Sequence, residues 1–184
     1  MTDQTDVRFM ALALQLGRRG LGEVWPNPAV GCVIVNKGRI VGRGRTMVDG
    51  RPHAEVMALR QAGPKAAGAT AYVTLEPCAH YGQTPPCAQA LLDAKIARVV
   101  VAIGDPDPRV DGGGIAMLRD VGIAVTVGVL EAEAKRDHAG FVGRVVTRRP
   151  YVTLKIAVTL DGKIATAAGE SQWITGPDAR HAVH

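Results

Sequence analysis

The sequence predicts a three-layer α/β/α sandwich built around a mixed, mostly parallel five-stranded sheet. Two observations lead to this fold class. Apolar runs of strand length alternate with segments of helical periodicity over residues 53–142, and such alternation is typical of parallel strand pairing. The run Val99–Ile103 is continuously apolar, as expected where helices cover both faces of a sheet.

The amino-terminal part predicts a helix followed by a β-hairpin. Apolar residues recur at helical spacing over 7–16, and Thr5 or Asp6 is a suitable cap. Two short segments of strand character, 30–35 and 39–41, then flank an Asn-Lys-Gly turn. We therefore expect the first two strands to be antiparallel.

The alternating part follows in order along the chain. We expect helices over 53–62, 85–94, 115–120 and 131–142, and strands over 71–75, 98–103 and 124–129. A further strand is expected over 151–158. Charge density rises at Arg148-Arg149-Pro150, so we place a domain boundary there, with domains at 1–147 and 148–184. The second segment is about three dozen residues long, too short to close a core of its own.

Composition excludes several classes of protein. Hydrophobic residues make up 47% and charged residues 21% of the chain, which is typical of soluble globular proteins. The aromatic share of 4% leaves few rings for stacking bases, so we expect no nucleic-acid partner. The net charge of +5 suits an anionic, phosphorylated small molecule.

Cysteine usage and the first apolar segment indicate the compartment. The chain has three cysteines, an odd and small number that does not suggest a disulfide framework. Residues 7–16 are apolar but follow Asp3 and Asp6, which fits neither a signal peptide nor a membrane span. We therefore expect a cytoplasmic protein without a membrane partner.

One group of residues carries metal chemistry. His53-Ala-Glu55 opens a predicted helix, Pro77-Cys78 follows a predicted strand, and Cys87 lies near the start of the next helix. Histidine nitrogen and cysteine thiolate are preferred zinc ligands, and three protein ligands leave the fourth position for water. Glu55 is not needed as a ligand and suits a general acid/base. H-x-E with P-C-x-x-C is a known zinc-deaminase signature, although here eight residues instead of two separate the cysteines.

Two other interpretations of this group stay open. His53 can be a capping or core histidine and the cysteines buried apolar residues. A structural zinc site is the stronger alternative, with His80 as the fourth ligand. The carboxylate of Glu55 beside the site favours catalysis over a structural role.

In combination, the motifs resemble the bifunctional riboflavin-biosynthesis deaminase–reductase family. Those that resemble its deaminase half are His53–Val56, Thr74–Cys87, Pro26–Gly31 and Asp105–Val110. Two later ones, Lys155–Ile164 and Gly169–Gly176, resemble the opening of its reductase half. The resemblance covers essentially the whole chain and implies a cytidine-deaminase-like fold.

The resemblance also implies an activity. The deaminase half converts 2,5-diamino-6-(ribosylamino)pyrimidin-4-one 5′-phosphate to the aminouracil product by zinc-dependent hydrolysis, with release of ammonia. The residue matches give His53, Cys78 and Cys87 to Zn²⁺, Glu55 to proton transfer, and Asn27, His80 and Asp105 to the substrate. An asparagine that stabilises a proline-flanked turn is an equally good interpretation of Asn27.

Three positions depart from the family pattern. Thr46 replaces a frequent histidine, Gln83 a frequent lysine or arginine, and Asp107 a frequent asparagine. Without a cation at position 83, another group must bind the phosphate. The candidates are Arg43, Arg45 and Arg51.

The reductase half binds NADPH. By residue match, Ser171 faces its substrate, while Ala157 and Trp173 line the cofactor site. A dinucleotide-binding domain needs several βαβ units, so we expect no NADPH binding by this chain. Exposed helix faces and the short second segment lead us to expect a homo-oligomer.

Two competing functions remain at this point. One is a deaminase of another nucleobase, including one in tRNA; the other is a non-catalytic module stabilised by zinc.

Overall fold

The computed structural model describes residues 3–82 and 84–183. Gln83, one of the three departures, lies outside the described residues. The chain divides into two compact units between Tyr151 and Val152. Among the described residues, no helix has both the length and the apolar character needed to span a bilayer.

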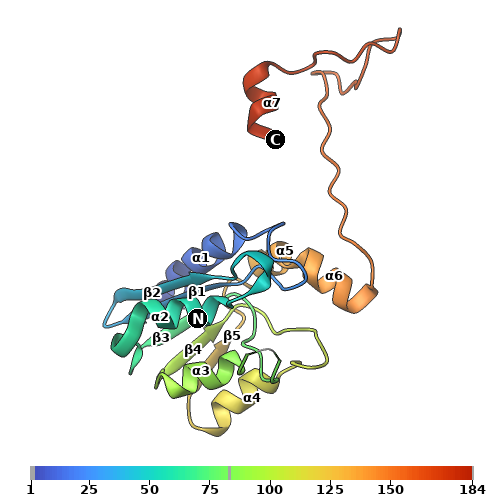
Figure 1. The fold of residues 1–184 in the computed structure, drawn as a ribbon. Helices are drawn as coiled ribbons and strands as arrows, with labels where there is room; N and C mark the ends of the chain where they lie inside the picture. Colours follow the sequence, from blue (N-terminus) through green and yellow to red (C-terminus); the bar gives the residue numbers. More distant parts are fainter. Residues whose placement is uncertain (1–2, 83, 184) are drawn as a thin grey trace. The chain divides into compact units, whose positions relative to one another are not determined.

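Within the described residues, five strands of the first unit form one sheet in the order β2-β1-β3-β4-β5. The strands are β1 (Gly31–Asn36), β2 (Arg39–Arg45), β3 (Thr70–Val73), β4 (Arg98–Val101) and β5 (Ala124–Val127). Strand β1 is antiparallel to β2 and β3, whereas β3, β4 and β5 are parallel to one another. Four of the five strands therefore run in one direction (Figure 1), and the predicted mixed, mostly parallel sheet is confirmed.

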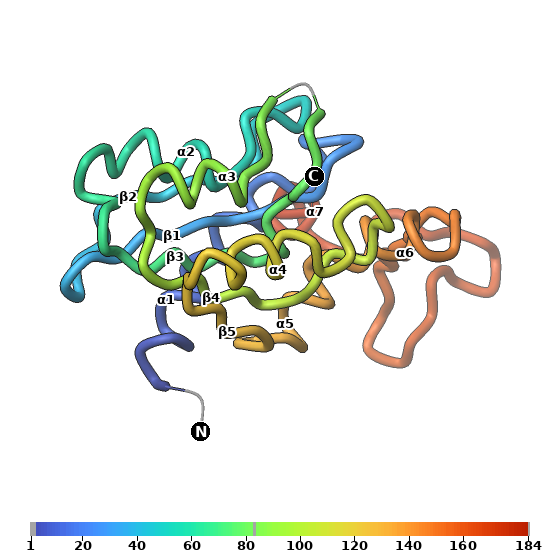
Figure 2. The backbone as a smooth tube through the Cα atoms, turned by 90° about the horizontal axis from the view of Figure 1, so that it is seen from below, coloured from blue at the N-terminus to red at the C-terminus, as the bar shows by residue number. Residues whose placement is uncertain are grey.

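Helices cover both faces of this sheet (Figures 1 and 2). One face carries α1 (Gln4–Arg18) and α5 (Glu131–Asp137), followed in the chain by α6 (Ala139–Thr147). The other face carries α2 (Ala54–Ala62), α3 (Cys87–Asp93) and α4 (Gly113–Asp120), while η1 (Val48–Gly50) and η2 (Gly63–Ala66) are short 3₁₀ turns. The predicted three-layer sandwich is thereby confirmed.

The core lies between these layers. Val33 of β1 and Val99–Val101 of β4 are fully buried, because both faces of the central strands are covered. Met10 of α1 packs from one face and Leu91 of α3 from the other, and both are fully buried.

Helix α2 lies unusually close to the edge strand β2. A Cβ on Gly44 would lie 2.1 Å from the carbonyl oxygen of Ala54, and one on Gly42 would lie 2.2 Å from that of Ala58. Glycine at both positions lets the helix rest on the strand backbone. This packing fixes the first turn of α2 at the edge of the sheet.

Three local expectations were wrong. Asp3, not Thr5 or Asp6, caps α1, with its Oδ1 accepting from Thr5 N at 2.9 Å. Helix α3 begins at Cys87 with Pro86 as its cap, two residues later than expected from Thr84 as cap and Pro85 as first residue. The expected helix 131–142 is two helices, because the chain bends at His138, whose buried ring lies 3.2 Å from Thr74 Oγ1.

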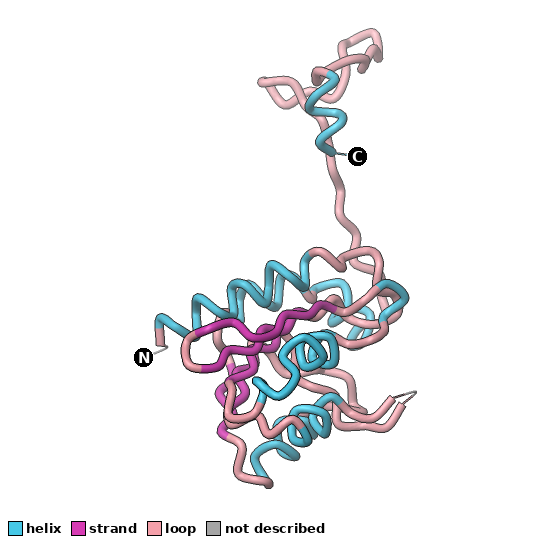
Figure 3. Tube along the Cα trace, turned by 60° about the vertical axis from the view of Figure 1, so that its left-hand side comes forward, coloured by secondary structure: helices cyan, strands magenta, loops and turns pink. Residues whose placement is uncertain are grey.

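The second unit contains one helix, α7 (Pro177–Val183), within its described residues. The strand expected over 151–158 was wrong, since these residues are irregular (Figure 3). Val152 and Leu154 are 80% and 78% exposed. A strand needs a partner for its backbone groups, and none of the strands in the described part of the chain pairs with this segment.

Candidate active site

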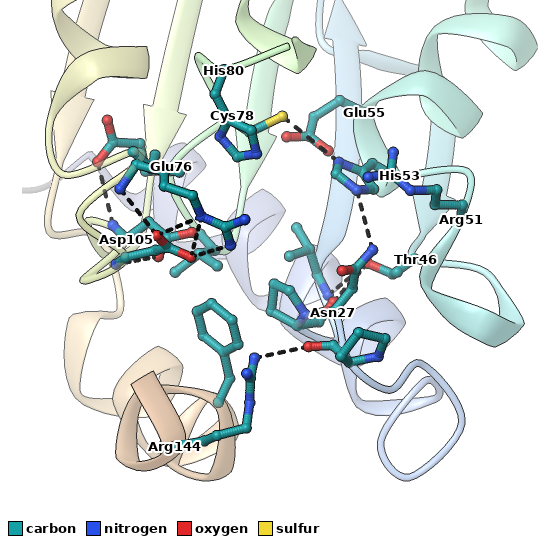
Figure 4. Close-up of a pocket in the computed structure, with 18 residues that line it drawn as sticks. Asn27, Thr46, Arg51, His53, Glu55, Glu76, Cys78, His80, Asp105 and Arg144 are labelled. Atoms are coloured by element: carbon teal, nitrogen blue, oxygen red, sulfur yellow. Dashed lines mark hydrogen bonds and ion pairs between the residues drawn. The ribbon is translucent and has the colours of Figure 1, made fainter. Parts of the chain in front are cut away.

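The site lies where the carboxyl ends of β3 and β4 meet the amino ends of α2 and α3. Strand β1 runs the opposite way, so the loop before Gly31 reaches the same edge. Crevices beyond the carboxyl ends of parallel strands are the usual binding sites of open α/β sheets. A pocket of about 240 Å³ lies here (Figure 4).

The structure brings together His53, Cys78 and Cys87. His53 is the cap of α2, Cys87 is the first residue of α3, and Cys78 follows β3. One ligand atom from each residue lies within 4.8 Å of the other two. His53 Nδ1 is 3.3 Å from Cys87 Sγ and 3.8 Å from Cys78 Sγ.

These distances fit a tetrahedral zinc ion. At the tetrahedral angle, zinc bonds of about 2.0 Å to nitrogen and 2.3 Å to sulfur place the two ligand atoms about 3.5 Å apart. The two observed separations bracket that value. In the described part of the chain, His80 is not a member of this cluster, so the arrangement offers three protein ligands.

The two thiols differ in acidity. The pKa of Cys78 falls to about 4, chiefly because the Cys87 thiol donates to its sulfur, helped by the ring of His53 and the backbone N–H of Cys87 at 3.3 Å. The same shared proton raises the pKa of Cys87. The hydrogen bond with Cys78 also raises the pKa of His53. The site thus already stabilises one thiolate, the form in which cysteine binds metals.

Glu55 lies beside this cluster in the first turn of α2 (Figure 4). Its side chain is buried, with the residue 3% exposed. Burial raises the pKa of its carboxyl to about 7, and negative charge on Cys78 acts in the same direction. A carboxyl with this pKa can both accept and release a proton near neutral pH.

Asn27 lines the pocket and also supports the loop before α2. Its Nδ2 donates to Gly50 O at 2.7 Å and lies 3.4 Å from His53 Nε2. Gly50 has φ +81°, and a Cβ there would lie 2.7 Å from Asn27 Nδ2, so only glycine fits. Both interpretations of Asn27 therefore have a basis in its contacts.

His80 and Asp105 also line the pocket. Asp105 is 8% exposed, and its Oδ1 accepts from Asp107 N at 2.9 Å. Burial raises the pKa of Asp105 to about 6. The Nδ1 atom of His80 is buried without a partner among the described residues.

Thr46 and Asp107, two of the three departures from the family pattern, make polar contacts in the wall of the pocket. Thr46 is 2% exposed, and its hydroxyl accepts from Val30 N at 3.0 Å and donates to Pro28 O at 2.9 Å. Asp107 is paired with Arg109, whose guanidinium lowers the pKa of that carboxyl to about 2.

Glu76 is a residue of structural importance that the sequence interpretation missed. Its buried carboxylate accepts from four backbone N–H groups, those of Asp105, Gly112, Gly114 and Ile115, at 3.0–3.3 Å. It thereby ties the strand end that carries Cys78 to the start of α4 and to the Asp105 loop. The signal in the sequence was a carboxylate directly before Pro77-Cys78, at the end of an apolar strand, where a buried charge must find partners.

Arg144 was also missed, because it reaches the pocket from a distant helix. Its Nη2 donates to Pro26 O at 2.9 Å across 118 positions of sequence. Nothing in the local sequence of α6 indicates this contact.

The residues matched to the reductase half lie in the second unit. Ser171 is exposed, and Trp173 is 69% exposed with its ring centroid 4.1 Å from the guanidinium carbon of Arg180. Ala157 is half-buried in the irregular segment.

Fold and site together define a zinc-binding deaminase domain. The sequence pattern of the cytidine and deoxycytidylate deaminase zinc-binding region matches residues 3–103, and the chain belongs to that family. The pattern of the RibD C-terminal domain matches residues 150–184. The zinc-binding character of the family and the His/Cys/Cys group agree on Zn²⁺.

Within this class the chain is similar to proteins of riboflavin biosynthesis, and the resemblance inferred from its motifs is confirmed. Riboflavin biosynthesis protein RibD of Haemophilus influenzae is 54% identical over 175 residues, which is 95% of this chain and 47% of the relative. The structure of Acinetobacter baumannii RibD is 53% identical, with a TM-score of 0.86 over 98% of this chain and 51% of that one.

A third relative carries a more explicit name. A diaminohydroxyphosphoribosylaminopyrimidine deaminase/5-amino-6-(5-phosphoribosylamino)uracil reductase from Thermotoga maritima is 46% identical, with a TM-score of 0.90 over 98% of this chain and 52% of its own. The chain thus spans about half the length of the relatives it matches.

Proposed function

We propose that this chain catalyses zinc-dependent hydrolytic deamination of 2,5-diamino-6-(ribosylamino)pyrimidin-4-one 5′-phosphate in riboflavin biosynthesis. The observation that carries the proposal is the placement of a buried carboxyl, Glu55, beside the ligand set His53, Cys78 and Cys87 in a pocket of small-molecule size. The names of the relatives support the substrate.

His53, Cys78 and Cys87 would hold a zinc ion, which would supply the Lewis acidity that lowers the pKa of the attacking water. Glu55 takes a proton from the attacking water at its carboxylate and delivers it to the departing amine. In the balance of the reaction, a C–O bond forms at the ring carbon, the C–N bond breaks, and ammonia leaves. Burial of Glu55 suits this role, because its pKa of about 7 lets it exchange protons in both directions.

Three further side chains orient the substrate in this proposal. The pyrimidine carries amino groups that donate hydrogen bonds, which match the carboxylate of Asp105 and the amide oxygen of Asn27. His80 lines the same pocket from the loop between the two cysteines. All three act on the ring while Glu55 moves the proton.

The remaining assignments are part of the same proposal. Residues 1–147 form the deaminase domain, and 148–184 begin an NADPH-dependent reductase domain in which Ala157, Ser171 and Trp173 face cofactor and substrate. We expect no NADPH binding by this chain, a homo-oligomer in solution, a cytoplasmic location, and no nucleic-acid partner.

Ammonia release from zinc-loaded protein tests the function. We expect turnover with the diaminopyrimidinone ribosylamine phosphate and at least about 100-fold lower kcat/KM with cytidine, deoxycytidylate or an adenosine in a tRNA stem-loop, because mismatched polar groups in a buried site cost several orders of magnitude. Preference for any of those three substrates contradicts the proposal. Absence of turnover with all of them supports a non-catalytic zinc module.

A further inference from the structure

Three arginines line the pocket, and two of them are held by other groups. They are Arg51, Arg109 and Arg144. Arg109 is neutralised by Asp107, with Nε donating to Oδ1 at 2.9 Å. Arg144 donates to a backbone carbonyl, and its guanidinium carbon lies 5.0 Å from the ring centroid of Trp25 and 5.5 Å from that of Phe141. These contacts make Arg144 a part of the wall.

Arg51 is held only loosely by comparison. Its Nη1 donates to the hydroxyl of Thr84 at 2.9 Å, and its Nη2 lies 3.5 Å from where a Cβ on Gly82 would be. Among the residues that the structure describes, Arg51 contacts a neutral hydroxyl and has no carboxylate in ion-pair distance. Its positive charge therefore remains for a ligand.

Charge is unevenly distributed around the pocket. Figure 4 shows Glu76 and Asp105 on the side opposite Arg51 and His53. Asp107 lies on the same side, where its backbone N–H bonds to Asp105, but Arg109 neutralises its charge. A dianionic group is repelled by the carboxylates of Glu76 and Asp105 and attracted to the side of Arg51.

The other two arginines that were candidates for this role lie elsewhere. Arg45 pairs with Glu23 at 3.1 Å and donates to Arg19 O. Arg43 is exposed on β2, where its backbone N–H bonds to Gln61. Neither lines the pocket in the described part of the chain.

We propose that Arg51, together with the hydroxyl of Thr84, binds the 5′-phosphate of the substrate and thereby sets the preference for a phosphorylated ligand. The inference rests on the proposed function. A guanidinium offers a planar pair of donors that matches two phosphate oxygens, and the Thr84 hydroxyl adds a third donor. Arg51 is two residues before the ligand His53, so phosphate recognition and the reacting centre share one loop.

The test compares kcat/KM for the substrate with and without its 5′-phosphate, using zinc-loaded wild type, Arg51→Gln, Arg51→Lys, Arg144→Gln and Arg43→Gln. We expect Arg51→Gln to lower the ratio of the two values about 10- to 100-fold, mainly through KM, as for loss of a charge-assisted hydrogen bond. Arg51→Lys should retain part of the preference, because it keeps the charge without the planar fork. The matched control Arg43→Gln, which removes one exposed arginine outside the pocket, should leave the ratio unchanged.

An unchanged ratio in Arg51→Gln overturns the inference, and so does a loss of preference in Arg144→Gln with none in Arg51→Gln. If Arg51→Gln does not retain zinc, the inference is tested instead by inhibition of the wild-type enzyme. Inorganic phosphate should then compete with the dephosphorylated substrate, and absence of competition overturns the inference. A wild type that releases ammonia from neither substrate overturns the proposed function itself, which separates the two failures.

Discussion

Similar apolar segments are buried in the first unit of this chain and exposed in the second. Val99–Val101 are fully buried in the inner strand β4, whereas Val152, Leu154 and Ile156 are 80%, 78% and 54% exposed. The difference lies in the neighbours. Strand β4 has a hydrogen-bonded partner on each side and helices over both faces, and the later segment has no strand partner within the described residues. An apolar run therefore becomes a strand only where other elements satisfy its backbone and cover its side chains.

The same contrast applies to the candidate functional residues. His53 and Cys87 sit at helix starts that rest on the buried sheet. Ser171 and Trp173 lie on an exposed segment. A catalytic constellation needs supporting contacts that fix its geometry, and the described residues of the first unit provide such contacts around His53 and Cys87.

The largest effect is expected from Glu55→Gln. This change keeps the volume and the zinc ligands but removes the group that moves the proton, so kcat should fall about 10²- to 10⁴-fold. The measurement is ammonia release together with zinc content. Wild-type turnover in a fully zinc-loaded variant would show that the buried carboxyl has no catalytic role.

Glu76→Gln should weaken the frame around the site. An amide replaces one accepting oxygen with a donor that faces backbone N–H groups, and we expect a loss of about 2–3 kcal/mol in the free energy of unfolding. Urea unfolding at pH 7 measures it. Glu133→Gln on the surface of α5, with a 3.8 Å contact to Arg136, is the control and should cost under about 0.5 kcal/mol. Equal losses in the two variants would contradict the bracing role.

Asp6→Asn tests the ion pair between Asp6 of α1 and Arg98 of β4. Asp6 is 3% exposed and accepts two bonds from Arg98 at 2.7–2.8 Å and one from Tyr72 at 3.0 Å. The hydrogen bonds from Arg98 lower the pKa of Asp6 in the folded state, so its stabilisation is complete above the unfolded pKa of about 3.9 and is lost as pH falls further.

We expect Asp6→Asn to cost about 2 kcal/mol at pH 7, with the difference from wild type shrinking below about pH 4. Unfolding curves between pH 3 and pH 7 give both quantities. A difference that does not vary with pH would mean that the carboxylate charge is not what stabilises the pair.

Removal of residues 152–184 should have the smallest effect. No residue from 152 to 183 is buried, so ending the chain after Tyr151 should change the Tm by less than about 2 °C and leave zinc content unchanged. Calorimetry and metal analysis check this. A larger fall in Tm, or loss of zinc, would show that the second unit contributes to the stability of the first.

Local sequence patterns were enough to predict most elements and their order. Apolar runs of strand length and helical periodicity over residues 7–129 indicate the element types, and the motif residues His53, Cys78 and Cys87 stand at predicted element ends, which the structure brings together. The expectations that were wrong concern features that depend on contacts between residues far apart in the sequence. The bend at His138 accompanies burial against Thr74, and the expected strand 151–158 lacks a partner.

The roles of Glu76 and Arg144 could not be predicted either, because they also depend on contacts with residues far away in the sequence. The amides that bind the Glu76 carboxylate lie 29 to 39 positions away, and the partner of Arg144 lies 118 positions away. No window of local sequence contains both members of these pairs. A charged residue in a segment that is expected to be buried indicates that it has a partner, but only the fold identifies that partner.

X-ray absorption at the zinc edge of the purified protein measures the metal site itself. We expect one zinc per chain with two sulfur ligands at about 2.3 Å, one imidazole nitrogen at about 2.0 Å and one further oxygen from water. A site without zinc, or one whose fourth ligand is a protein atom, would contradict it.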